Sequence, residues 1–180
     1  MKTLFIILIS FLLVFPSCKK HHTPTSNQPD NPYGLPNATQ TGANTLGFLL
    51  NGQAWTPQGF NGTANLSINV DFGFNKGIFG VAAYKINTGE HIGFGMRDSL
   101  NFISIPSSIP LNGRSLFQFG FASNYCFIDY YDTTVYRRGS LTITKLDKSN
   151  QIISGTFNAN LYKAGCDTIK ITNGRFDMKY

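Results

Sequence analysis

The sequence predicts an all-β fold: an antiparallel β-sandwich, or a closed or partly open barrel, of about ten strands. From Thr45 onward, short runs rich in Phe, Ile, Val, Tyr and Thr are broken about every eight to twelve residues by Gly, Asn, Asp or Pro. No window repeats its apolar residues with a helical period, and Glu90 is the only glutamate in the chain. Helix is therefore expected to be a minor component.

Asn-Gly pairs and polar turns divide these runs into strands. The pairs at 51–52 and 173–174 supply the positive φ angles of two-residue hairpins. The second hairpin would pair residues 168–172 with 175–180 and would turn Asp177 toward water. Residues 147–150 predict a turn between strands at 141–146 and 152–161. Residues 98–113 predict the longest loop, which is the first place to look for a binding surface.

Alternation of apolar and polar residues identifies the buried faces of these strands. Phe117, Phe119 and Phe121 share one face of a predicted strand, as Leu141 and Ile143 do in another. In a third strand, the apolar face consists of Ile153, Gly155, Phe157, Ala159 and Leu161, and the polar face of Ser154, Thr156, Asn158 and Asn160. One dry face and one wet face are typical of an antiparallel sheet.

Residues 1–18 have the pattern of a secretory signal. Lys2 precedes an apolar run at 4–15 that is interrupted by Ser10, and a small residue, Ser17, stands directly before Cys18. This arrangement resembles the signal of a bacterial lipoprotein, in which Cys18 would be lipidated and would become the new N-terminus. The sequence thus predicts a membrane partner, reached through a lipid anchor, in the outer membrane.

Residues 19–43 predict a disordered tether, and residues 44–180 a single all-β domain. The tether is polar and contains four prolines, with almost nothing to bury. Its first residues, Lys19 to His22, contain no acidic side chain. Since some surface-exposed lipoproteins carry an acidic signal at this position, its absence favours the periplasmic side of the membrane over the cell surface.

Two cysteines remain after Cys18, at positions 126 and 166. Outside the cytoplasm disulfides persist, and an even number of cysteines invites pairing. A Cys126–Cys166 bridge would close a loop of about forty residues and stabilise the fold by up to ~4 kcal/mol in the chain-entropy model. The alternative that the sequence leaves open is two buried free thiols.

Three segments resemble an uncharacterised family of Gram-negative envelope lipoproteins, known only as a domain of unknown function. These segments are LPNATQTGANTLGFLLNGQAW near the start, SGTFNA in the middle and DTIKITNGRFDMKY at the end. The resemblance covers residues 35–180. It implies an envelope lipoprotein with an all-β domain, and it brings no activity and no catalytic residues.

The sequence shows no set of residues arranged for catalysis, metal binding or cofactor binding. The domain has one histidine, His91, which follows Glu90 in a predicted strand, so that the two side chains point to opposite faces. There is no Gly-x-Ser-x-Gly elbow, no metal-ligand spacing and no phosphate-loop pattern. The net charge of +6 comes from scattered basic residues, which does not suit a nucleic acid partner.

Aromatic residues make up 14% of the chain and include a cluster of tyrosines around Cys126. Tyrosine and tryptophan combine a flat apolar ring with a polar tip, which suits sugar and protein surfaces. We therefore expect a non-enzymatic module that binds a glycan or another envelope protein, with Trp55, Tyr125 and Tyr131 as the ligand platform. The alternatives are a structural or assembly lipoprotein without a small ligand, and a small hydrolase with two aspartates facing one pocket.

Overall fold

The protein is described by a computed structural model, which covers residues 33–112 and 116–180. The predicted signal, its lipidation site Cys18 and residues 19–32 of the predicted tether lie outside the described residues. The described chain belongs to one compact unit, residues 31–180. Among these described residues, no helix has the length and apolar character needed to cross a bilayer.

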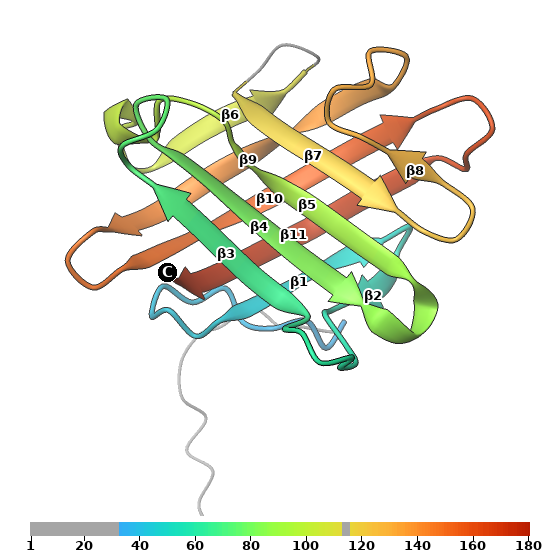
Figure 1. Ribbon diagram of the computed structural model, residues 1–180, viewed down its shortest axis with the longest axis horizontal. Coiled ribbons are helices and arrows are strands. Elements are labelled where there is room, and N and C mark those ends of the chain that lie inside the picture. Colours follow the sequence, from blue (N-terminus) through green and yellow to red (C-terminus); the bar gives the residue numbers. More distant parts are fainter. Residues whose placement is uncertain (1–32, 113–115) are drawn as a thin grey trace, which may run out of the picture. The chain divides into compact units, whose positions relative to one another are not determined.

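Two antiparallel sheets form the fold (Figure 1). The six-stranded sheet has the order β2 (Gln53–Trp55), β1 (Thr45–Leu50), β11 (Ile169–Lys179), β10 (Ile152–Tyr162), β9 (Tyr136–Asp147) and β6 (Ser107–Leu111). The five-stranded sheet has the order β3 (Leu66–Asp71), β4 (Ile78–Lys85), β5 (Glu90–Met96), β7 (Phe117–Ala122) and β8 (Phe127–Ile128). Two short 3-10 helices, η1 (Ile86–Thr88) and η2 (Leu100–Phe102), complete the described elements.

The fold is an all-β sandwich, because neither sheet closes on itself and both sheets bury side chains in one shared core. Phe94 of β5 lies at the centre of this core. Its ring centroid is 6.0 Å from Phe119 of its own sheet, and 4.5 Å and 5.4 Å from Phe157 and Phe176 of the other. The apolar faces predicted for β7, β9 and β10 are confirmed, since their alternating residues are buried.

The predicted turns at 51–52 and 147–150 are confirmed. Asn51 and Gly52 have φ angles of 49° and 85°, and they join β1 to β2 with Leu50 opposite Gln53. The turn after Asp147 joins β9 to β10, and the carboxylate of Asp147 accepts hydrogen bonds from the backbone N–H and the side chain of Asn150.

The predicted hairpin at 173–174 is wrong, because β11 runs straight through it. Phe157 pairs with Gly174 and Ala159 with Ile171, so β11 contains one residue more than its neighbour β10 at this point. Asn173 has a φ angle of 53°, and the positive angle therefore serves a β-bulge. Gly174 lies so close to β10 that a Cβ atom would stand 2.5 Å from the carbonyl oxygen of Phe157.

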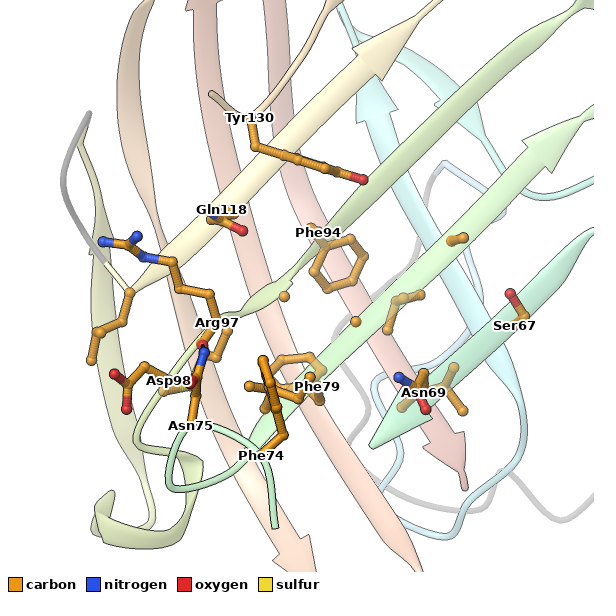
Figure 2. Close-up of a pocket in the computed structure, with 18 of the residues that line it drawn as sticks. Ser67, Asn69, Phe74, Asn75, Phe79, Phe94, Arg97, Asp98, Gln118 and Tyr130 are labelled. Carbon is orange, nitrogen blue, oxygen red and sulfur yellow. Dashed lines mark hydrogen bonds between the residues drawn. The ribbon is translucent and has the colours of Figure 1, made fainter. Parts of the chain in front are cut away.

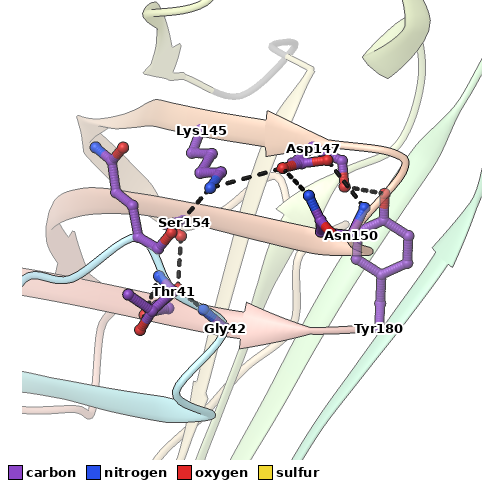
Figure 3. A network of polar contacts seen from close by, with 9 residues as sticks. Thr41, Gly42, Lys145, Asp147, Asn150, Ser154 and Tyr180 are labelled. Carbon is purple, nitrogen blue, oxygen red and sulfur yellow. Dashed lines mark hydrogen bonds and ion pairs between the residues drawn. The ribbon is translucent and has the colours of Figure 1, made fainter.

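The end of the predicted tether is also wrong, because residues 35–43 pack against the domain. Leu35 is 3% exposed, and residues 39–43 cover the outer face of β11 at Asp177. The carboxylate of Asp177 accepts hydrogen bonds from the Thr41 N–H at 2.9 Å and the Gly42 N–H at 2.8 Å, and Ser154 donates its hydroxyl at 2.7 Å. Figure 3 shows Thr41 and Gly42 beside Ser154. Asp177 and Ser154 are therefore buried, although both were expected to face water.

The predicted loop at 98–113 contains η2 and the strand β6. This strand pairs only with β9, at the edge of its sheet, with Pro110 opposite Ser140. Proline is compatible with an edge strand, because that strand has one side without a partner for its backbone N–H. Pro110 is therefore consistent with a short edge strand in this range.

Cys126 and Cys166 lie at disulfide distance, with sulfur atoms 2.11 Å apart and Cα atoms 5.4 Å apart. Cys126 stands between β7 and β8 of the five-stranded sheet, and Cys166 between β10 and β11 of the six-stranded sheet. The bridge thus joins the two layers of the sandwich at one end, across 40 residues of sequence.

Candidate functional site

The outer face of the five-stranded sheet has a floor of small and amide side chains. The antiparallel registers place these residues in two rows across β3, β4, β5 and β7. One row consists of Ser67, Ala82, Gly93 and Gly120, and the other of Asn69, Gly80, Gly95 and Gln118. Because side chains alternate along a strand, the neighbours Val81, Phe94 and Phe119 point inward and are buried. The sequence thus gives this sheet one apolar face and one nearly bare face.

Larger residues stand around this floor and turn it into a groove of about 740 Å³, which we name the sheet groove. Figure 2 shows Ser67 and Asn69 on one side and Tyr130 on the other, with Phe74, Asn75, Arg97 and Asp98 grouped at one end. Phe74 belongs to the β3–β4 turn and is 56% exposed, and Tyr131, beside Tyr130, is 72% exposed. A volume of this size is in the range of small-ligand sites.

Glycine in the floor allows the ring of Tyr130 to lie directly on the sheet. A Cβ atom at Gly93 would stand 2.8 Å from the Tyr130 hydroxyl oxygen, and one at Gly120 would stand 2.9 Å from a ring carbon. Burial raises the pKa of the Tyr130 hydroxyl, and the nearby Asp129 adds to the effect. At neutral pH the hydroxyl therefore keeps its proton and can both donate and accept a hydrogen bond at the groove.

The segment that carries Tyr130 and Tyr131 is fixed by polar contacts on either side. The guanidinium of Arg137 in β9 donates hydrogen bonds to the backbone carbonyls of Asp129 and Asp132. Asp132 forms an ion pair with Lys163 at 2.9 Å, and the Tyr131 N–H donates to the Asp129 carboxylate at 2.8 Å. Tyr130 and Tyr131, which form an aromatic wall of the sheet groove, are thus held in place without a ligand. Such preorganisation lowers the entropy that a protein loses when it binds a ligand.

The three residues of the predicted platform do not converge. Trp55 is 1% exposed, stacks on Phe48 with ring centroids 4.7 Å apart and donates its indole N–H to Glu90, so its assignment to a ligand surface is wrong. Tyr125 is 92% exposed, but it lines a separate hollow beside Cys126. Of the three, Tyr131 alone lines the sheet groove.

Sequence reasoning missed Phe74 and the small-residue floor, and it placed Tyr130 in the tyrosine cluster around Cys126 without choosing it for the platform. A signal for the floor was present, since glycine alternates with large apolar residues in Gly93-Phe94-Gly95 and recurs at Gly80 and Gly120. Nothing local to those positions shows that they become neighbours. Their alignment depends on the register of four strands, of which β3, β4 and β5 are consecutive and β7 follows only after η2 and β6.

Titratable groups in the described part of the chain are arranged for packing and turns. His91 stacks on Tyr84 with ring centroids 5.4 Å apart. Among the described residues that line the sheet groove, Asp98 is the single carboxylate, and it accepts the hydroxyl of Ser99 at 2.7 Å. No group of three metal-ligating side chains occurs within the described residues.

Comparison with known proteins gives no match to a protein-family model, to a curated protein or to a solved structure.

Proposed function

We propose that this protein is a non-enzymatic binding module of the cell envelope whose sheet groove receives a glycan. The observation that carries the proposal is a floor without bulky side chains, flanked by the exposed rings of Phe74 and Tyr131. Pyranose rings present flat faces of C–H groups, which stack on aromatic rings, and their hydroxyls bond to amide and hydroxyl side chains. Asn69, Gln118 and Tyr130 supply such polar groups along the groove.

The shape of the groove favours a chain of sugars over a protein surface. A stable protein interface buries about 800 Å² per partner and has a bulky apolar centre. The floor of the sheet groove instead consists of Gly, Ala, Ser, Asn and Gln. A narrow polymer that lies across the strands can approach such a floor closely and still reach the aromatic wall.

We also propose that the protein is attached to the outer membrane through lipidated Cys18, on the periplasmic side. The apolar run at 4–15 and the Ser17-Cys18 pair support the anchor, and the absence of acid at 19–22 supports the side. A lipid-anchored domain samples a thin layer next to the membrane. Glycans of the envelope lie within that layer, which is consistent with a glycan ligand.

A leucine placed on the floor tests the glycan proposal. Gly80 is exposed, its φ angle is not positive and a Cβ atom there meets nothing within 4 Å, so Gly80→Leu fills the groove without straining the sheet. Binding is measured by calorimetry against a panel of neutral and acidic hexasaccharides. We expect the affinity of Gly80→Leu to fall at least about tenfold, the effect of losing roughly 1.4 kcal/mol of contacts.

The matched control is Thr156→Leu, which adds the same side chain to an exposed strand position of the other sheet. This variant should bind like the unmodified protein. If no hexasaccharide binds, or if both leucine variants bind equally well, the sheet groove is not a glycan site. Copurification with an envelope protein, lost in Gly80→Leu alone, would then assign the groove to a protein partner.

A further inference from the structure

A second hollow, of about 280 Å³, adjoins the sheet groove, and its charged lining residues are Arg97, Arg137 and Asp132. The two cavities share Arg97, Gln118, Tyr130 and Tyr131 in their linings. Arg137 lines the second hollow from β9. We name this space the arginine hollow. The two cavities therefore meet at the four shared residues, and Arg97 borders both of them.

Arg137 is a buried cation that has no carboxylate partner within 4 Å among the described residues. Its side chain is 7% exposed, and the ion pairs found in the described chain are Lys145–Asp147 and Lys163–Asp132. Its guanidinium donates hydrogen bonds to two backbone carbonyls, and its Nε–H has no partner among the residues that the structure describes. Burial lowers the pKa of the Arg137 guanidinium, and the nearby carboxylates of Asp132 and Asp129 offset part of this effect without a direct ion pair.

Arg97 follows β5 and adds a second guanidinium at the junction of the two cavities. The Arg97 residue is exposed, and its side chain forms no hydrogen bond or ion pair with the described residues. The anionic groups nearby are already engaged: Asp132 pairs with Lys163, and Asp98 accepts the Ser99 hydroxyl. The Asp129 carboxylate accepts the Tyr131 N–H. Arg97 is thus free to bind an anion from outside the protein.

We propose that the arginine hollow binds the carboxylate of an acidic sugar, so that the ligand of the sheet groove is a uronate-containing glycan. This inference rests on the proposed function, since it assigns a class of sugar to the same groove. A guanidinium presents two parallel N–H groups, which match the two oxygens of a planar carboxylate. Arg97 would make this contact, and the buried charge of Arg137 would add attraction from behind.

The test uses the full-length chain and two matched probes, a galacturonic acid hexamer and the same hexamer after chemical reduction of its carboxyl groups. The probes share ring shape and length and differ in charge. Hydrogen bonds to charged groups are strong, so we expect the acidic hexamer to bind roughly 10- to 100-fold more tightly than the reduced one. Arg97→Gln should remove this preference and leave the affinity for the reduced hexamer unchanged.

Arg138→Gln is the control, because it removes the same charge from an exposed side chain that lies over Tyr136, away from the groove. This variant should retain the preference. If both hexamers bind equally well, or if the two arginine variants lose the preference equally, the carboxylate site is overturned and the glycan groove stands. If neither hexamer binds and Gly80→Leu changes the binding of no other sugar, both proposals fall together.

Discussion

Asp177 is a fully buried carboxylate that fixes the first described residues of the chain to the sandwich. It is 0% exposed and accepts hydrogen bonds from Thr39, Thr41, Gly42, Ala43 and Ser154. Burial by itself raises the pKa of Asp177, but the hydrogen bonds outweigh it, so that this pKa lies well below its ordinary value. The charged form is therefore the one that the fold requires.

Replacing Asp177 by Asn should destabilise the protein by about 2–3 kcal/mol at neutral pH, because the amide has one acceptor oxygen in place of two and its NH₂ would face backbone N–H donors of residues 41–43. Urea unfolding measures the difference. Asp71→Asn is the control, since Asp71 accepts two backbone N–H groups in an exposed turn and loses the same charge. That variant should stay within about 0.5 kcal/mol of the unmodified protein.

The effect of Asp177→Asn should also depend on pH. A carboxyl whose pKa is lowered in the folded state stabilises that state above its unfolded pKa, about 3.9, and loses this contribution as pH falls through the folded pKa. The difference in the free energy of unfolding between the two proteins should therefore shrink progressively as pH falls below about 4. A gap that stays constant down to pH 2 would show that the charge of Asp177 is not what holds residues 39–43.

In strand β11, pairing with the neighbouring strands decides a structure that the local sequence leaves open. Apolar residues alternate on both sides of Asn173, and the side chains of Ile171 and Phe176 are buried, whereas Asp177, expected to face water, is covered by residues 39–43. The bulge was missed because an Asn-Gly pair with a positive φ serves a hairpin and a bulge equally well. The outcome is decided by β1 and β10, which flank β11 along its length. Strand β10 directly precedes β11 in the chain, but β1 is distant in sequence.

Gly174→Ala tests the close packing at this bulge. The added Cβ would stand 2.5 Å from the carbonyl oxygen of Phe157 and 2.6 Å from the Phe157 ring. The carbonyl oxygen belongs to the backbone and cannot move aside unless β10 shifts. We expect a loss of about 1–3 kcal/mol, as for overpacked cores. Gly80→Ala, in a strand position with open space, should be neutral or slightly stabilising. Equal stabilities of the two variants in urea unfolding would refute this account of the bulge.

At the scale of the whole molecule, local patterns predicted an antiparallel all-β fold but not the site. Periodicity identifies which residues face the core, but it left a sandwich and a barrel open, and the structure has the sandwich. The groove depends on which strands become neighbours, and the buried position of Trp55 depends on contacts with Phe48 and Glu90. These contacts join residues from separate strands. The aromatic residues near Cys126 and the type of residue at Trp55 therefore could not predict them.

The distance of the domain from the membrane follows from where the packed chain begins. Since residues 35–43 pack on the sandwich, the segment between the proposed anchor Cys18 and Tyr33 contains residues 19–32, which span at most about 50 Å when fully extended. With Cys18 lipidated and a glycan as ligand, as proposed, this shorter segment would limit the sheet groove to glycans near the membrane surface. The sheet groove could not contact an envelope glycan whose distance from the membrane exceeds the length of this segment plus the size of the domain.

Replacing Cys18 by Ala tests this arrangement, because an anchored protein needs the acyl chains of the lipid to remain with the membrane. The unmodified chain, expressed in a Gram-negative host, should incorporate labelled palmitate and sediment with the outer membrane, whereas Cys18→Ala should do neither. Cys126→Ala, which changes a cysteine that lies at disulfide distance from Cys166, should still be labelled. Palmitate incorporation in Cys18→Ala would place the lipid elsewhere.

Protease added to intact cells decides the side of the membrane, since a periplasmic domain is protected and a surface domain is cleaved.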